Sequence, residues 1–188
     1  MSQYYYTMAS LPMLSYDGSL HITHELFLDY CSRELSEDAM KKLLNCNISV
    51  PDNEELLEGA AKHFWEWEKS LKNELVKLRA KNMNVDEKEY IHDGETLFGV
   101  PEIAQSAMKI DSPLEAENFL NRSRWSALNE LGTGHFFDFH ALAIYYLQLQ
   151  LLERKHLFDA DKGFENYQQI YKNIISNVSE DITVGDSK

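Results

Sequence analysis

Cysteine is scarce in this sequence, with only Cys31 and Cys46 among 188 residues. Two thiols form neither a disulfide framework nor a zinc site with four cysteine ligands. We therefore expect both to be reduced, buried residues of a cytoplasmic protein. The N-terminal stretch MSQYYYTMASLPML lacks the positively charged start of a secretory signal, which agrees with that location.

Positive charge is also scarce. The chain has 18 lysines and arginines against 31 aspartates and glutamates, which gives a formal net charge of −13. Binding to nucleic acid or to an anionic membrane surface requires a basic face, so both classes of partner are disfavoured. No stretch approaches the roughly 18 consecutive apolar residues of a membrane-spanning helix. We therefore expect a protein that faces water or a basic protein partner.

The usual catalytic motifs are missing as well. There is no GxSxG and no HExxH pattern, and the glycines of residues 132–134 are not followed by the lysine of a phosphate-binding loop. Carboxylates often lie near one another, but 31 acidic residues make chance pairs unavoidable. We therefore expect no catalytic residue, no cofactor and no metal ion.

What the sequence does contain is helical periodicity. Residues 52–83 include no proline and one glycine. Apolar residues follow one another there mostly at steps of three and four: Leu57, Ala60, Ala61, Phe64, Trp67, Leu71, Leu75 and Leu78. That spacing predicts one long helix with a continuous apolar stripe. Asp52 and Glu55 match a capping box at its start, and Glu58 and Lys62 are placed to pair one turn apart.

Further helices are predicted by their first residues. Four N-cap residues each precede a stretch with helical periodicity: Thr23, Ser36, Ser112 and Asp138. Pro101 begins a short helix through Met108. A last helix is predicted from the spacing of Phe164, Tyr167, Ile170, Tyr171, Ile174 and Val178. Residues 3–14 are predicted to be an extended lead-in, with a short edge strand as the alternative.

Together these patterns predict an all-α fold, a bundle of about seven helices around the one long spine helix. The chain is predicted to form one helical domain over residues 1–178, followed by a disordered polar tail over residues 179–188. An alternative division has two related helical halves, 1–84 and 101–178, joined by the charged connection 85–100.

The most distinctive predicted surface is basic. Between Lys69 and Lys81 there are five basic residues and one acidic residue, in an otherwise acidic chain. The negative end of the helix dipole explains the basic residues in the last turn of this helix. It explains Lys69 and Lys72 less well, and for these two lysines an acidic binding partner is the alternative. Tryptophan and arginine are typical interface anchors. The alternative for Trp65 and Trp125 is that each belongs to a wider buried face of its helix. The contacts expected on these grounds are Trp65, Lys69, Lys72, Arg122 and Trp125.

The histidines offer a different hypothesis. His135, Asp138 and His140 lie close in sequence but straddle a predicted helix start, so a metal site requires His63 or Glu66 to join them. A small metal-dependent helical enzyme is therefore one alternative function. The simpler interpretation is that His135 follows a glycine turn and hydrogen-bonds the carbonyls at a helix end.

Three segments resemble known families. The segment WEKSLKNELVKLRAK at residues 67–81 resembles a helix of the C/d subunit of archaeal-type and vacuolar-type rotary ATPases. Two more segments are MSQYYYTMASLPMLSYD at residues 1–17 and RWSALNELGTGHFFDFHALAIYYLQLQLLERK at residues 124–155. Together the three are similar to a bacterial family of unknown function encoded within V-type ATPase operons. The resemblance covers most of residues 1–175.

This resemblance implies a non-catalytic, all-helical component of a V/A-type rotary ATPase, peripheral to the inner membrane. Its implied partners are the central stalk and the membrane rotor ring. The structural or contact residues that it implies are Glu68, Asn73, Arg79, Ala80, Lys81, Trp125, Glu130, His135, Asp138 and Arg154. C/d subunits are longer and have three repeats, whereas this chain has room for at most two. A generic helical adaptor unrelated to ATPases is the other alternative function.

Overall fold

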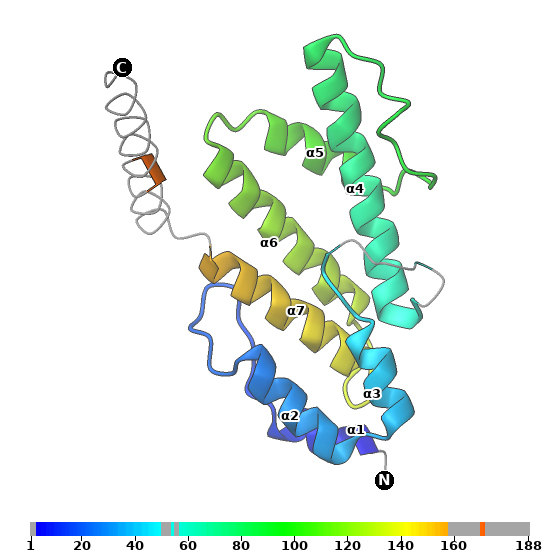
Figure 1. Cartoon of the computed structure of the whole chain (residues 1–188), viewed down its shortest axis with the longest axis vertical. Helices are drawn as coiled ribbons and strands as arrows, with labels where there is room; N and C mark the ends of the chain where they lie inside the picture. The colour runs from blue at the N-terminus through cyan, green and yellow to red at the C-terminus, as the bar shows by residue number, and fades with distance from the viewer. Residues whose placement is uncertain (1–2, 50–53, 55–56, 158–169, 172–188) are drawn as a thin grey trace, which may run out of the picture. The chain divides into compact units, whose positions relative to one another are not determined.

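A computed structural model describes residues 3–49, 54, 57–157 and 170–171 of the chain. Over these residues the regular structure consists of seven helices, α1 to α7, and includes no strand (Figure 1). This confirms the predicted all-α fold. The chain divides into two units, Met1–Arg154 and Lys155–Lys188. The first unit contains α1 to α6 and most of α7, so both predicted halves contribute to it.

The first three helices are short. They are α1 (Gln3–Ser10), α2 (His24–Glu34) and α3 (Glu37–Leu44). The Thr23 side chain accepts a hydrogen bond from the Leu26 N–H, and the Ser36 side chain accepts one from the Ala39 N–H, which confirms both predicted N-caps. The predicted extended lead-in is wrong, because residues 3–10 form α1. That helix contains no acidic residue in its first turn and no basic residue in its last, so its sequence lacks the usual signals of a helix end.

The long helix α4 (Gly59–Met83) begins later than predicted. Gly59 has a φ of 54°, in the left-handed region, and a right-handed helix cannot continue back through that residue. Glu58 is therefore not in the helix, and its carboxylate pairs with Lys42 at 2.9 Å instead of with Lys62. The predicted capping box falls on Asp52 and Glu55, which lie outside the described residues.

The second half of the described chain contains α5 (Val100–Met108), α6 (Pro113–Leu131) and α7 (Phe139–Leu157). Ser112 caps α6 by accepting a hydrogen bond from the Glu115 N–H, and Gly132 is its C-cap. The Asp138 carboxylate accepts a hydrogen bond from the Ala141 N–H at 2.8 Å and caps α7. The two N-caps Ser112 and Asp138, and the proline in the first turn of α5, agree with the prediction. The predicted last helix lies outside the described residues except for Ile170 and Tyr171, which are helical.

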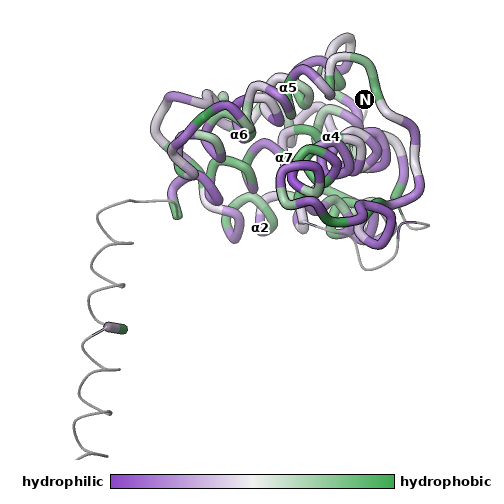
Figure 2. Tube along the Cα trace, turned by 90° about the horizontal axis from the view of Figure 1, so that it is seen from above, coloured by the Kyte–Doolittle hydropathy of each residue, from purple (hydrophilic) through white to green (hydrophobic). Residues whose placement is uncertain are grey.

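Two hydrophobic clusters form the interior of the described part of the first unit. The larger one surrounds α7, which lies between α2 and α6 in both views (Figures 1 and 2). In this cluster the Phe27 ring stacks on Tyr145 and Tyr146 at centroid distances of 5.5 and 5.1 Å. The smaller cluster joins α4, α5 and α6, and its buried residues are Leu71, Leu75, Val100, Ala104, Ala107 and Leu120.

The charged connection between α4 and α5 lies against α4. The Asn73 side chain donates to the His92 carbonyl at 2.7 Å and accepts from the His92 N–H at 2.9 Å. The Ser70 hydroxyl accepts from the Leu97 N–H at 2.9 Å. Buried polar residues of α4 thus satisfy backbone groups of the connection. None of the described helices is both long and apolar enough to span a bilayer.

Candidate functional site

Polar side chains are buried where α4 meets α6. The described part of the chain contains six buried polar or charged residues, and five of them are on these two helices: Glu68, Ser70, Asn73, Asn121 and Arg124. Buried charged groups are rare unless they are paired, because burial removes their hydration. The site is therefore defined by what pairs with Glu68 and Arg124.

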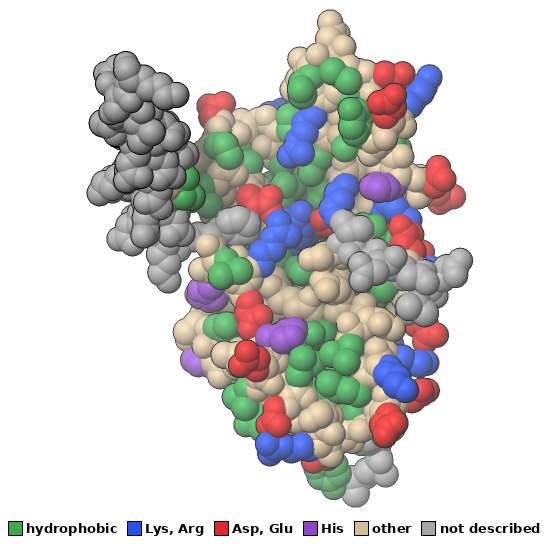
Figure 3. All heavy atoms as spheres, in the orientation of Figure 1, with side chains coloured by type: hydrophobic (Ala, Val, Ile, Leu, Met, Phe, Trp, Pro, Cys, Tyr) green, Lys and Arg blue, Asp and Glu red, His purple; other side chains and the backbone are tan. Residues whose placement is uncertain are grey.

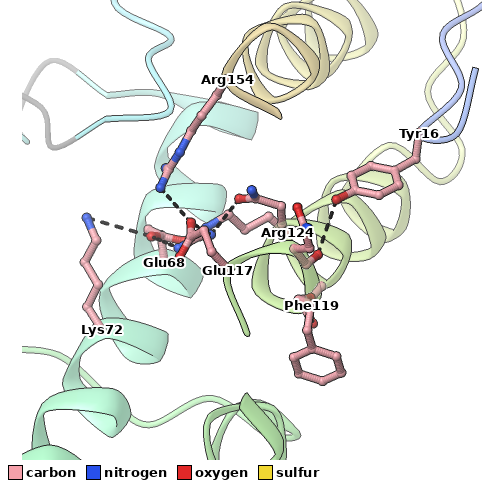
Figure 4. A network of polar contacts seen from close by, with 10 residues as sticks. Tyr16, Glu68, Lys72, Glu117, Phe119, Arg124 and Arg154 are labelled. Carbon is pink, nitrogen blue, oxygen red and sulfur yellow. Dashed lines mark hydrogen bonds and ion pairs between the residues drawn. The ribbon is translucent and has the colours of Figure 1, made fainter. Parts of the chain in front are cut away.

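Arg124 is the centre of this buried network (Figure 4). Its Nε and Nη2 donate to the two carboxylate oxygens of Glu68 at 2.9 and 3.1 Å, a bidentate arrangement that links α6 to α4. Its Nη1 donates to Glu117 Oε1 at 3.0 Å and to Asn121 Oδ1 at 2.9 Å. Four hydrogen bonds thus compensate the lost hydration of a side chain that is only 5% exposed.

Two more cations extend the network toward solvent. Arg154 Nη2 of α7 donates to Glu117 Oε1 at 2.7 Å, and Lys72 Nζ lies 3.8 Å from Glu68 Oε1 (Figure 4). Glu117 therefore accepts from arginines of two helices. The network connects α4, α6 and α7 through residues that are 37 and 56 positions apart in the sequence.

The carboxylates keep Arg124 charged. Burial alone would lower the pKa of its guanidinium, but Glu68 and Glu117 outweigh that effect and hold the pKa above its ordinary value. A buried ion pair of this kind contributes little net stability relative to apolar packing, yet removing one partner costs about 3–5 kcal/mol. Its main consequence is geometric: the bonds to Glu117 and Asn121 orient the guanidinium within α6, and the two directional bonds to Glu68 link α6 to α4.

Tyr16 attaches the segment after α1 to the same helix. Its hydroxyl donates to the Asn118 carbonyl at 3.3 Å, and its ring lies 5.7 Å from that of Trp125. The Arg122 guanidinium stands 4.8 Å over the Tyr16 ring and pairs with Asp17 at 3.0 Å. These contacts place residues of the N-terminal segment on α6 beside the buried network (Figure 4).

Some residues predicted to contact a partner are buried, and others are at least partly exposed. Trp65, Glu68 and Asn73 are buried, at 5%, 2% and 5% exposure, and their contacts are internal. The buried Trp65 corresponds to the wider buried face that was its other interpretation. Trp125 is half-buried, and Arg154 is engaged with Glu117.

The predicted basic face of α4 is largely neutralised by nearby acids. Lys69 pairs with Glu54 at 2.7 Å, Lys72 approaches Glu68, and Lys77 pairs with Glu74 at 2.6 Å. Arg79 and Lys81 are exposed. On the face seen in Figure 3, basic side chains are interspersed with acidic ones. Binding of an acidic partner would thus compete with ion pairs that already exist.

The histidine group is organised around the start of α7. His135 Nδ1 lies 2.6 Å from Asp138 Oδ2, and the His135 and His140 rings stack at a centroid distance of 4.0 Å. Partial burial works to raise the pKa of Asp138, but the hydrogen bonds from His135 and the Ala141 N–H lower it below its ordinary value. The His135 backbone N–H donates to the carbonyl of Gly132, the C-cap of α6, at 3.1 Å, while the His140 ring bonds the Leu131 carbonyl at 3.0 Å, so both histidines contact the end of α6.

The same histidines do not assemble into a metal site in the described part of the chain. No three histidine, cysteine or carboxylate side chains converge there as a metal ion requires. Burial lowers the pKa of His140, so this ring stays neutral near pH 7.

The network includes three residues that were not among the predicted site residues: Glu117, Asn121 and Arg124. They are spaced four and three residues apart, which places them on one face of α6. A polar stripe at helical spacing between apolar positions is the signal that would have indicated a buried network.

Comparisons of the chain with family models, curated proteins and solved structures find no match.

Proposed function

We propose that this protein is a non-catalytic helical subunit or accessory protein of a V/A-type rotary ATPase. In this role it couples the central stalk to the membrane rotor ring, in the manner of the C/d subunits. The observation that supports the proposal is a convergence in space. The three sequence segments that resemble the ATPase-associated families meet at one place, although they are far apart in the chain.

Each segment contributes a contact at that place. Tyr16 belongs to the first segment and packs on Trp125 of the third. Glu68 belongs to the second segment and pairs with Arg124 of the third. Arg154, near the end of the third segment, reaches Glu117 and through it Arg124. The three resembling segments therefore pack against one another, which supports treating their resemblance as one feature of the chain.

A coupling element must transmit force between neighbours without changing shape. The buried network supports such a role, because directional arginine hydrogen bonds link α6 to α4 and α7 to α6. A net charge of −13 favours basic surfaces of the neighbouring subunits, with an affinity that falls as salt rises.

The test is affinity purification from native cells. The tagged full-length chain is cross-linked, purified and analysed by mass spectrometry, with a tagged unrelated acidic protein as control. We expect stalk or ring subunits to be enriched over the control and to be lost from uncross-linked samples as salt rises from about 0.05 to 0.5 M. Recovery of no ATPase subunit above the control contradicts the proposal.

A helical adaptor with no link to ATPases is the second candidate. It is favoured by one observation, the exposed aromatic rings of α1 and of the turn before α7, because aromatic residues are frequent anchors of protein interfaces. The same purification separates the two candidates: a reproducible partner that is not an ATPase subunit supports the adaptor.

A further inference from the structure

An aromatic surface lies where α1 meets the turn between α6 and α7. We define it by Tyr5 and Tyr6 of α1 and Phe136 and Phe137 of the turn, which are 44%, 58%, 70% and 48% exposed. The Tyr5 ring lies 4.7 Å from the Phe137 ring and 5.7 Å from the Tyr6 ring. Exposed apolar groups that touch one another in this way mark interaction sites far more often than scattered ones do.

A hollow of about 300 Å³ adjoins this aromatic surface. Its apolar lining includes Met8, Leu128, Phe136 and Ile144. Two amides in the lining, Asn129 and Gln148, bond to each other at 2.8 Å. His135 and Tyr145 also line the hollow, and they bond Asp138 and the Pro12 carbonyl. Because the polar side chains of the lining have partners, the hollow is suited to an apolar side chain.

The aromatic surface is also nearly free of charge, which is unusual in this chain. Residues 3–15 and 132–137 contain no lysine, arginine, aspartate or glutamate. The adjoining Asp138 carboxylate is engaged by His135 and by the Ala141 N–H. A basic partner would gain little here, because basic groups need accessible carboxylates.

We propose that the aromatic surface binds a second copy of this chain. Two chains with a net charge of −13 repel each other, so they associate best through a face where carboxylates do not meet. A two-fold dimer places the same patch on both sides. Phe136 is both the most exposed of the four rings and part of the hollow lining, so in such a dimer it fits the hollow of the other copy.

The size of the surface sets the expected strength of the dimer. An aromatic side chain presents about 150–250 Å² when fully accessible, so four rings at roughly half exposure supply about 300–500 Å² per copy. Standard stable interfaces bury about 800 Å² per partner. We therefore expect a weak, reversible dimer that forms at high protein concentration.

The salt dependence distinguishes this dimer from binding to a basic partner. Added salt screens the repulsion between two acidic chains and strengthens their association. The same salt screens attraction to a basic partner and weakens that complex. The sign of the salt effect therefore identifies the kind of occupant.

Sedimentation equilibrium of the full-length chain tests the proposal, at about 1 to 300 µM protein and at about 0.05 and 0.5 M NaCl. We expect a reversible monomer–dimer equilibrium with a lower dissociation constant at high salt. Phe136→Asp is expected to raise that constant about tenfold or more, because it places a charge at the centre of the interface. Phe98→Asp is the matched control, since Phe98 is fully exposed but lies outside the aromatic surface.

Circular dichroism melting of both variants shows whether each remains folded. Three results overturn the proposal: a monomer at every concentration and salt, a dimer weakened by salt, or equal effects of the two substitutions. Failure of the ATPase purification leaves this measurement unaffected, because the dimer does not depend on that partner.

Discussion

The region around α7 and the region formed by α4, α5 and α6 are held together by different interactions. Among the residues that the structure describes, the cluster around α7 contains twenty buried residues, and α7 itself buries ten side chains with no charged group among them. The second cluster has only six buried residues, three of them alanine or valine. This second region also contains Glu68, Asn73, Asn121 and Arg124 in its interior.

The geometry of the two regions depends on different kinds of interaction. Apolar packing around α7 tolerates exchanges of similar volume, because dispersion and the hydrophobic effect are not directional. The hydrogen bonds of Arg124 are directional, so the α4–α6 contact depends on chemical identity as well as size. Substitutions that preserve volume should therefore have small effects around α7 and large effects in the network.

The largest expected effect is that of Arg124→Met. This change removes both bonds to Glu68 and leaves a carboxylate that is 2% exposed without its main partner. We expect the free energy of unfolding to fall by about 3–5 kcal/mol, measured by urea denaturation.

Arg122→Met is the matched control, because Arg122 lies two positions away on the same helix and forms an exposed pair with Asp17. Its effect should be small. Equal losses for the two arginines would show that burial of the ion pair makes no difference.

A cavity around α7 is expected to have the next largest effect. Leu149 is fully buried, so Leu149→Ala should destabilise the protein by about 2–5 kcal/mol. Leu149→Met keeps the volume and should cost less than about 1.5 kcal/mol. Leu44→Ala, at a half-exposed leucine, serves as the control in the same denaturation experiment. A loss for Leu149→Met as large as that for Leu149→Ala would contradict tolerant packing in this region.

Asn73→Ala should have an intermediate effect, confined to the connection between α4 and α5. The substitution leaves the N–H and carbonyl of His92 without their side-chain partner, and because His92 is exposed and water can replace that partner, we expect a cost of about 0.5–1.5 kcal/mol. Hydrogen exchange of the His92 amide should accelerate, while that of α7 amides should not. Asn82→Ala, at an exposed position of the same helix, is the control. Unchanged exchange at His92 would mean that Asn73 does not hold the connection.

The smallest expected effect needs no substitution: it is the low reactivity of the two cysteine thiols in the apolar region around α7. Burial raises the pKa of both the Cys31 and Cys46 thiols to about 12. At pH 8 only about one thiol in ten thousand is then the reactive thiolate. Alkylation by iodoacetamide should therefore be very slow in the native protein and rapid in urea, as followed by mass spectrometry. Rapid native labelling of either thiol would indicate that this region opens readily.

The apolar region was largely predictable from the sequence. Its helices begin at local signals, such as the caps Thr23, Ser36 and Asp138, and their apolar residues recur at helical spacing. The helix α1 was missed because its stretch QYYYTMAS has no cap signal and three consecutive tyrosines suited to a strand. The start of α4 was misplaced because the left-handed conformation of Gly59 depends on its tertiary surroundings.

The buried network was not predictable in the same way. Glu68 and Arg124 are 56 residues apart, and nothing in the local sequence of either indicates the other. Glu68 was interpreted as a contact residue from the family resemblance, and Arg124 was not among the expected contact residues. Pairing across such a distance becomes visible only when α4 and α6 are placed side by side.

The most direct test of the account is a double-mutant cycle between Glu68 and Arg124. Glu68→Gln, Arg124→Met and the double variant are compared with the unmodified chain by urea denaturation. We predict a coupling energy of about 1–3 kcal/mol, with the double variant more stable than the sum of the single losses implies. Losses that add within about 0.5 kcal/mol would contradict the claim that this pair fixes α4 on α6.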